Sequence, residues 1–187
     1  MFRDIIRLAN SFPFLLIVTV YSLNAQAFVE SDIKYIRSDF NRINQLTHLM
    51  APEHIDLPDM GAGVQVYKTG GRLIKLVAHY PAEKEKSVRE YYFDGHGLFF
   101  AFISNHIYKH PVDWHKRKDY QNNNSSGLAE DKPEISENRY YFKDDKLIRW
   151  LDPNKKDVSP SAKSFDQAHI EIWEEVYALV EMLDRSK

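Results

Sequence analysis

The chain has 187 residues, of which 43% are hydrophobic and 28% charged, and its formal net charge is −2. This length and composition predict one globular domain with enough apolar material for a core, and they exclude an intrinsically disordered chain. The near-neutral charge gives no attraction for nucleic acid, so we expect no nucleic-acid partner.

Residues 1–27 have the features of a signal peptide. Arg3 and Arg7 form a positive n-region, residues 12–23 form an apolar h-region, and Ala25-Gln26-Ala27 is a small-x-small cleavage site. The apolar stretch is shorter than the about 20 residues that cross a bilayer, so we expect cleavage rather than a retained anchor. The mature chain should therefore begin at Phe28, without stable membrane insertion.

The absence of cysteine narrows the expected location. Without a cysteine after the cleavage site the chain cannot be a bacterial lipoprotein, and without disulfides its core alone must hold the fold. These features predict a periplasmic or secreted bacterial protein.

An amphipathic helix opens the predicted mature chain, beginning near Ser31 and ending before Pro52. Its apolar stripe recurs at three- and four-residue spacing: Ile33, Ile36, Phe40, Ile43, Leu46 and Met50. The prolines and glycines of residues 51–63 then predict a connection into the first strand.

Three segments share one hairpin pattern, in which aromatic or β-branched residues precede a four-residue turn and a leucine opens the next apolar run. They are residues 66–74, 91–99 and 140–148. Three tandem hairpins predict an antiparallel meander of about six strands. The polar residues 117–136, with Asn-Asn-Asn-Ser-Ser-Gly inside them, interrupt this rhythm and predict a flexible insertion.

A second amphipathic helix follows the last hairpin. Its expected apolar stripe is Phe165, Ala168, Ile172, Val176, Val180 and Leu183, with Trp173 beside it. Two helices flanking one antiparallel sheet predict an α+β fold, with residues 28–187 as a single domain.

The segment Glu137-Asn138-Arg139-Tyr140-Tyr141-Phe142, continued by Lys146-Leu147-Ile148-Arg149-Trp150-Leu151, resembles a phrase in uncharacterised exported bacterial proteins. Those proteins pair a leading helix with tandem aromatic hairpins. The resemblance covers the hairpins and the first helix, and it implies that fold without implying an activity.

Strand alternation predicts two faces of the sheet, provided that each four-residue turn sets its flanking residues opposite one another, Phe93 with Leu98 and Phe142 with Leu147. Counting from each four-residue turn places a helix-covered core on one side: Ile74, Leu76, Ala78, Tyr80, Tyr92, Phe99, Ala101, Ile103, Tyr141, Ile148 and Trp150. The other side mixes aromatic and apolar residues with cations: Val77, Tyr91, Phe93, Leu98, Phe100, Phe102, Tyr140 and Phe142, with Lys68, Lys75, His79, Arg89 and Arg149. Its candidate binding residues are Lys75, His79, Arg89, Tyr91, Phe100, Tyr140 and Arg149.

Cations beside aromatic rings suit an acidic or carbohydrate-like partner, as well as cation–π contacts within the sheet. The alternative interpretation is that the second helix covers this side and the basic side chains pass along its rim. Because so large an apolar patch is rarely left exposed, a face covered by the second helix and an open binding face are equally well supported by the sequence.

The histidines His106, His110 and His115 are weak candidates for a zinc site, with Asp113 between them. Pro111 prevents a helix that would align them, and the segment leaves a strand, so ordinary strand-end and loop histidines are expected instead. We therefore expect no metal, no cofactor and no catalytic residue, since nucleophile and phosphate-binding motifs are also missing from the sequence.

The leading hypothesis is an exported, non-enzymatic binding or accessory protein of the bacterial cell envelope, with an unknown protein or envelope ligand as its partner. One alternative is an enzyme of unrecognised type that uses a histidine-containing pocket, and another is a structural component of the envelope. An enzyme needs convergent titratable groups in a concave pocket, whereas a binding module needs an apolar or aromatic surface.

Overall fold

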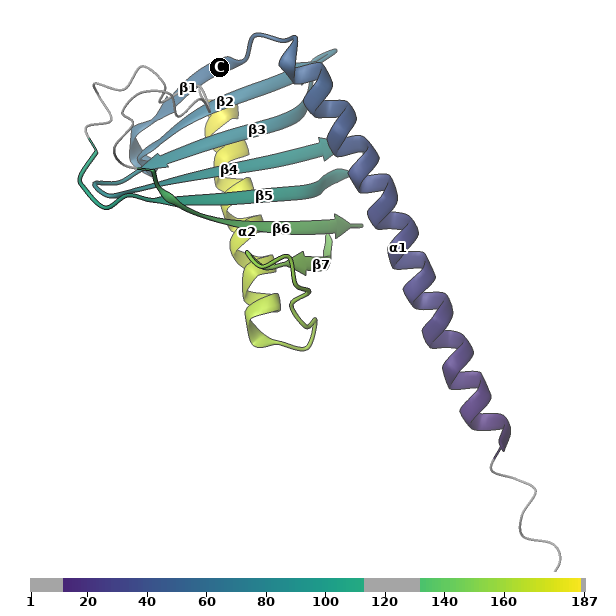
Figure 1. Ribbon diagram of the computed structural model, residues 1–187. Helices are drawn as coiled ribbons and strands as arrows, with labels where there is room; N and C mark the ends of the chain where they lie inside the picture. The colour runs from purple at the N-terminus through teal and green to yellow at the C-terminus, as the bar shows by residue number, and fades with distance from the viewer. Residues whose placement is uncertain (1–11, 113–131, 186–187) are drawn as a thin grey trace, which may run out of the picture.

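Seven antiparallel strands form one sheet, and their spatial order follows the chain from β1 to β7 (Figure 1). The computed structural model describes residues 12–112 and 132–185, with side chains from Val29 onward except that of Asp59. The strands are β1 (Glu53–Leu57), β2 (Ala62–Thr69), β3 (Arg72–Pro81), β4 (Glu85–Asp94), β5 (Gly97–Ile107), β6 (Glu134–Lys143) and β7 (Lys146–Leu151). The predicted α+β class and antiparallel meander are confirmed, with seven strands instead of six.

β1 is the strand that the sequence prediction missed. Its five residues pair antiparallel with β2, and a 3-10 turn over Pro58–Met60 joins the two strands. Gly61 ends that turn in the left-handed region, with φ 61°. The proline and glycine that suggested a loop thus form the connection between two strands, and the charged residues of β1 suit a sheet edge.

Each of the three hairpins predicted from the sequence, β2–β3, β4–β5 and β6–β7, contains one extra residue on its second strand. In the second hairpin Phe93 pairs with Leu98, but Tyr92 pairs with Phe100, which leaves Phe99 out of the ladder. The corresponding residues of the first and third hairpins are Ile74 and Ile148. All three bulged side chains pack in or against the same apolar cluster, so the repeated bulge supplies part of the surface on which the N-terminal helix packs.

The two helices lie on opposite faces of the sheet (Figure 1). α1 (Phe12–His48) packs with Ile33, Ile36 and Ile43 on the cluster that contains the bulges, and α2 (Lys163–Arg185) packs on the other face. The residues buried on α2 are Phe165, Ala168, Ile172, Val176, Leu179 and Leu183.

The bulges overturn part of the predicted assignment to faces, because one inserted residue reverses the alternation beyond it. Side chains predicted for the core with Leu76 but found beneath α1 are Ile74, Tyr92, Phe99, Tyr141 and Ile148. Side chains predicted for the binding face but found in the α2 cluster are Tyr91, Phe93, Leu98, Tyr140 and Phe142.

Three predicted boundaries also differ. α1 already begins at Phe12 rather than near Ser31, and its expected core residue Leu46 is 42% exposed while the neighbouring Thr47 is buried. β6 starts at Glu134, so residues 134–136 belong to a strand and not to the insertion; residues 113–131 lie outside the described part of the chain. Within the residues that the structure describes, no helix is long and apolar enough to cross a membrane.

Candidate functional site

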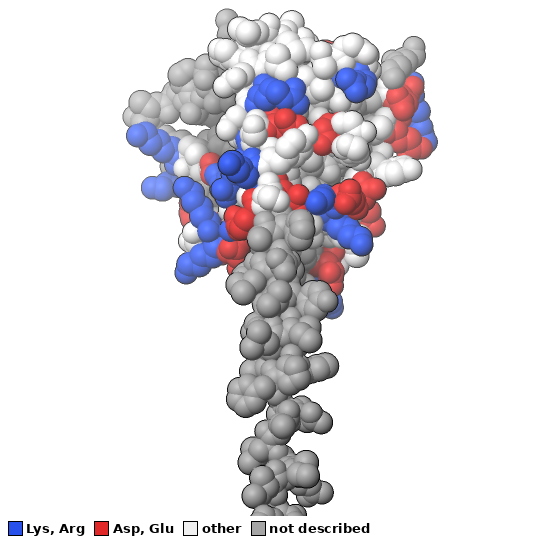
Figure 2. Space-filling model, turned by 90° about the vertical axis from the view of Figure 1, so that its right-hand side faces the viewer, with Lys and Arg blue, Asp and Glu red and all other residues white. Residues whose placement is uncertain are grey.

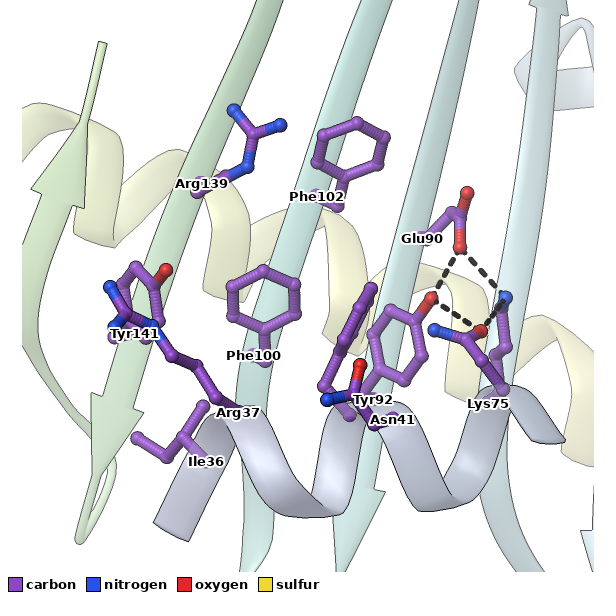
Figure 3. Close-up of a pocket in the computed structure, with 12 residues that line it drawn as sticks. Ile36, Arg37, Asn41, Lys75, Glu90, Tyr92, Phe100, Phe102, Arg139 and Tyr141 are labelled. Carbon is purple, nitrogen blue, oxygen red and sulfur yellow. Dashed lines mark hydrogen bonds and ion pairs between the residues drawn. The ribbon is translucent and has the colours of Figure 1, made fainter. Parts of the chain in front are cut away.

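A cavity of about 580 Å³ lies between α1 and the sheet, within the size range of small-molecule sites (Figure 3). One wall is α1, and strands β3 to β6 form the other. The lining residues are Ile36, Arg37, Phe40, Asn41 and Asn44 from α1, with Lys75, Glu90, Tyr92, Phe100, Phe102, Arg139 and Tyr141 from the sheet.

Ion pairs hold the N-terminal side of the docked segment of α1. Lys143 donates to both carboxylate oxygens of Asp32 at 2.8 Å. Arg149 donates mainly to Asp157, with Nε 2.6 Å from Oδ1, and its Nη1 lies 3.5 Å from Glu30. Basic and acidic side chains are interspersed on the face seen in Figure 2. Such a mixture produces no large field of one sign there.

A polar network closes one end of the cavity. Lys75 Nζ lies 2.7 Å from Glu90 Oε2 and donates to Asn44 Oδ1 at 2.9 Å. The Tyr92 hydroxyl donates to the same Glu90 oxygen at 2.5 Å and lies 3.0 Å from Asn44 Oδ1. The side chains of Lys75 and Glu90 are only 11% and 13% exposed. Burial, reinforced by the charge of Glu90, raises the pKa of the Tyr92 hydroxyl, which therefore remains a donor.

Aromatic rings form the floor next to this network. The ring of Phe40 lies 5.0 Å from that of Tyr92 and 5.1 Å from that of Phe100, and Phe100 lies 5.0 Å from Tyr141 in an edge-on arrangement. Tilted and edge-on contacts at these distances are favourable, so the four rings form one continuous apolar surface.

Two arginines mark the opposite end of the cavity, on the β6 side in Figure 3. Arg139 lies with its guanidinium 5.2 Å from the centre of the Phe102 ring, and its Nη2 donates to Glu137 at 2.7 Å. Its Nη1 is buried and has no hydrogen-bond partner among the residues that the structure describes. The guanidinium of Arg37 lies 6.0 Å from the Tyr141 ring. Lys75 is neutralised by Glu90, whereas Glu137 compensates only one of the two arginines among the described residues, so this end carries the net positive charge.

The predicted binding residues do not form one surface. Lys75 and Phe100 line the cavity. Arg149 and His79 share their face of the sheet but lie outside the lining, since Arg149 pairs with Asp157 and His79 is 2% exposed. Burial, followed by the charge of Lys86, lowers the pKa of His79 to about 4.

The other three predicted residues, Arg89, Tyr91 and Tyr140, face α2. Arg89 forms an ion pair with Glu175 of α2, and Tyr91 is fully buried. Burial raises the pKa of Tyr140 to about 12. For these residues the alternative interpretation applies, because the second helix covers them.

The histidine candidates do not converge in the described residues. His106 Nε2 lies 2.9 Å from Ser104 Oγ, and burial with the nearby charge of Lys86 lowers the pKa of the imidazole. His110 is exposed, and His115 lies outside the described residues. No group of three potential metal ligands occurs in residues 12–112 and 132–185.

A different histidine borders an open hollow of about 340 Å³ on the α2 side. His169 lines it with Asp145 and Trp173, and His169 Nε2 lies 3.0 Å from the Asp145 carbonyl oxygen. None of these three residues is a hydroxyl or thiol nucleophile, so the hollow does not match the triad logic of covalent catalysis.

The sequence analysis missed most polar residues of the cavity. Arg37, Asn41 and Asn44 follow one another at helical spacing beside the apolar stripe of α1, which is a signal that could have been found. Glu90 and Arg139 directly precede Tyr91 and Tyr140, which the prediction placed on the binding face. Strand alternation therefore assigned Glu90 and Arg139 to the other face, and the bulges concealed that both point toward α1.

The arrangement can bind, orient and neutralise a small molecule. The described residues of its lining include no serine, cysteine or histidine, and the one carboxylate among them is already engaged by Lys75 and Tyr92. Comparisons with protein-family models, with curated proteins and with solved structures found no match, so the function is inferred from the cavity itself.

Proposed function

We propose that the protein is an exported, non-enzymatic binding protein of the bacterial cell envelope, which holds one small amphipathic molecule between α1 and the sheet. The observation that carries the proposal is a 580 Å³ cavity with an aromatic floor and polar groups at its two ends. Ligand sites typically combine a mostly apolar lining with a few polar groups that fix orientation.

The polar network supports binding over catalysis. Lys75, Glu90, Tyr92 and Asn44 bond to one another, so none is poised as a free base or nucleophile. A network that is satisfied without ligand keeps the wall of the cavity rigid, which lowers the entropic cost of binding.

Export is the second part of the proposal, and it predicts cleavage after Ala27. The contacts between α1 and the sheet that the structure describes begin at Val29 and Glu30, so cleavage there leaves them intact. The intact mass of protein from the periplasmic fraction should correspond to a chain that begins at Phe28. An Ala27→Leu variant should accumulate uncleaved because the site requires a small residue. Periplasmic protein that retains Met1 would contradict export by cleavage.

Filling the cavity should abolish ligand binding. N-phenyl-1-naphthylamine is a neutral probe that fluoresces in apolar surroundings, and we expect saturable binding with one probe per chain. Asn41 lines the cavity from α1, so Asn41→Trp should weaken the affinity at least about tenfold by occupying the space.

Ser38→Trp is the matched control, because Ser38 is an exposed residue of α1 outside the lining. It should bind the probe like the unaltered chain, with circular dichroism confirming the fold of both variants. Equal binding by the Asn41→Trp variant, or no saturable binding at all, would refute the cavity as the site.

A further inference from the structure

We infer that the ligand carries a carboxylate, which Arg139 receives at the β6 end of the cavity while the apolar body of the ligand lies over Phe100 and Phe102. This inference rests on the proposed function and specifies the chemical class of its ligand: an aromatic or acyl carboxylate. It follows from the state of the polar groups at the two ends.

The Lys75 end does not attract an anion. The ammonium group is 2.7 Å from Glu90 and also donates to Asn44. An oxyanion placed there would meet the Glu90 carboxylate at close range, and like charges repel strongly in a partly buried site. This end is therefore suited to the neutral part of a ligand.

The Arg139 end has the opposite property. Nη2 is held by Glu137 and the guanidinium lies over the Phe102 ring, so the group is fixed in position. Nη1 is buried without a partner among the described residues, which leaves part of the guanidinium charge unsatisfied. The side chain as a whole is 24% exposed and lines the cavity, so a carboxylate there meets the accessible part of the guanidinium and compensates its charge through a charge-assisted hydrogen bond.

The surroundings of Arg139 favour one negative charge on an otherwise apolar molecule. Arg37 lies at the same end (Figure 3) and adds a second positive charge from α1, while Glu137 compensates part of the first. From this end the rings of Phe102, Phe100 and Phe40 line the cavity toward the Lys75 network. A highly charged or fully polar ligand would place polar groups against these rings, where they lose hydrogen bonds to water and find no partners, so such a ligand would bind weakly.

The test is displacement of bound N-phenyl-1-naphthylamine by matched acids and amides. 2-Naphthoate is compared with 2-naphthamide, and decanoate with decanamide, at low ionic strength. Each acid should bind about tenfold or more tightly than its amide, because a hydrogen bond to a charged group is worth at least that factor. The pair that displaces the probe at the lower concentration shows whether the apolar body of the ligand is aromatic or acyl.

Arg139→Gln should reduce the preference for the acid to less than about threefold, because the acid loses its charged partner and is weakened far more than the amide. Arg37→Gln, an exposed position whose substitution leaves the core intact, should reduce it partially. Arg72→Gln is the control, since Arg72 is exposed at the start of β3 and outside the lining.

The outcomes separate the inference from the proposed function. If the probe binds in the cavity but acids and amides displace it equally, the function stands and the carboxylate inference is overturned. An acid preference that survives Arg139→Gln and Arg37→Gln also overturns it. If the probe does not bind, the proposed function and the inference fall together.

Discussion

Replacing Lys75 by methionine is expected to lower the free energy of unfolding by about 3 kcal/mol. The substitution leaves Glu90 buried beneath α1 with Tyr92 as a hydrogen-bond donor but without a counterion. An unpaired buried carboxylate is far more costly than the lost attraction of an exposed pair. Urea denaturation of the mature chain, followed by circular dichroism, measures the change.

Two controls identify the cause. Lys68 forms an exposed pair with Glu53 at 2.8 Å, so Lys68→Met should cost at most about 1 kcal/mol. The double variant Lys75→Met with Glu90→Gln should be more stable than Lys75→Met alone, because the unpaired charge is gone. If the Lys75→Met variant is as stable as the Lys68→Met control, the network around Lys75 does not stabilise the packing of α1 on the sheet.

Acid is expected to destabilise the protein through His79. Its pKa is about 4 in the folded chain, lowered by burial and by the charges of Lys86 and His54, against an ordinary value of 6.5. Between these values the unfolded chain binds a proton that the folded chain does not. Stability is therefore complete above pH 6.5 and decreases as pH falls toward 4, by up to about 3 kcal/mol.

The check is the free energy of unfolding measured at intervals from pH 7.5 to pH 4. A His79→Gln variant should show a flatter profile over this window whatever its stability at neutral pH. His96→Gln, in the exposed turn between β4 and β5, should keep the slope of the unaltered chain. If the free energy of unfolding of the His79→Gln variant falls with pH as steeply as that of the unaltered chain, groups other than His79 cause the acid sensitivity.

The sequence contained enough information for the fold class and for the hairpins. The pairs Phe93 with Leu98 and Phe142 with Leu147 occur as expected, because turn residues and flanking apolar runs determine local pairing. β1 was missed because it is short and has only two alternating apolar residues, Ile55 and Leu57, and because Pro58 follows directly after its last residue.

The faces of the sheet were harder to predict. A bulge is one additional apolar residue in an already apolar run, as at Phe99 between Leu98 and Phe100, and such a run has no alternation to interrupt. Only the three copies together reveal it, since Ile74, Phe99 and Ile148 occupy equivalent positions.

The cavity depends on how α1 docks, which no local pattern determines. Lys75 and Phe100 were predicted as binding residues, but Arg37 and Asn44, which line the cavity with them, belong to a helix far away in the sequence. Ion pairs such as Asp32 with Lys143 and the bulged side chains together set that docking position. Both are tertiary features.

The central claim is that the ligand site lies between α1 and the sheet. Nuclear Overhauser contacts between unlabelled N-phenyl-1-naphthylamine and the isotope-labelled mature chain test it most directly. We predict contacts from the probe to Phe40, Phe100 and Phe102, which line the cavity. Contacts confined to Trp173 and Tyr177 of α2, on the opposite face of the sheet, would contradict it.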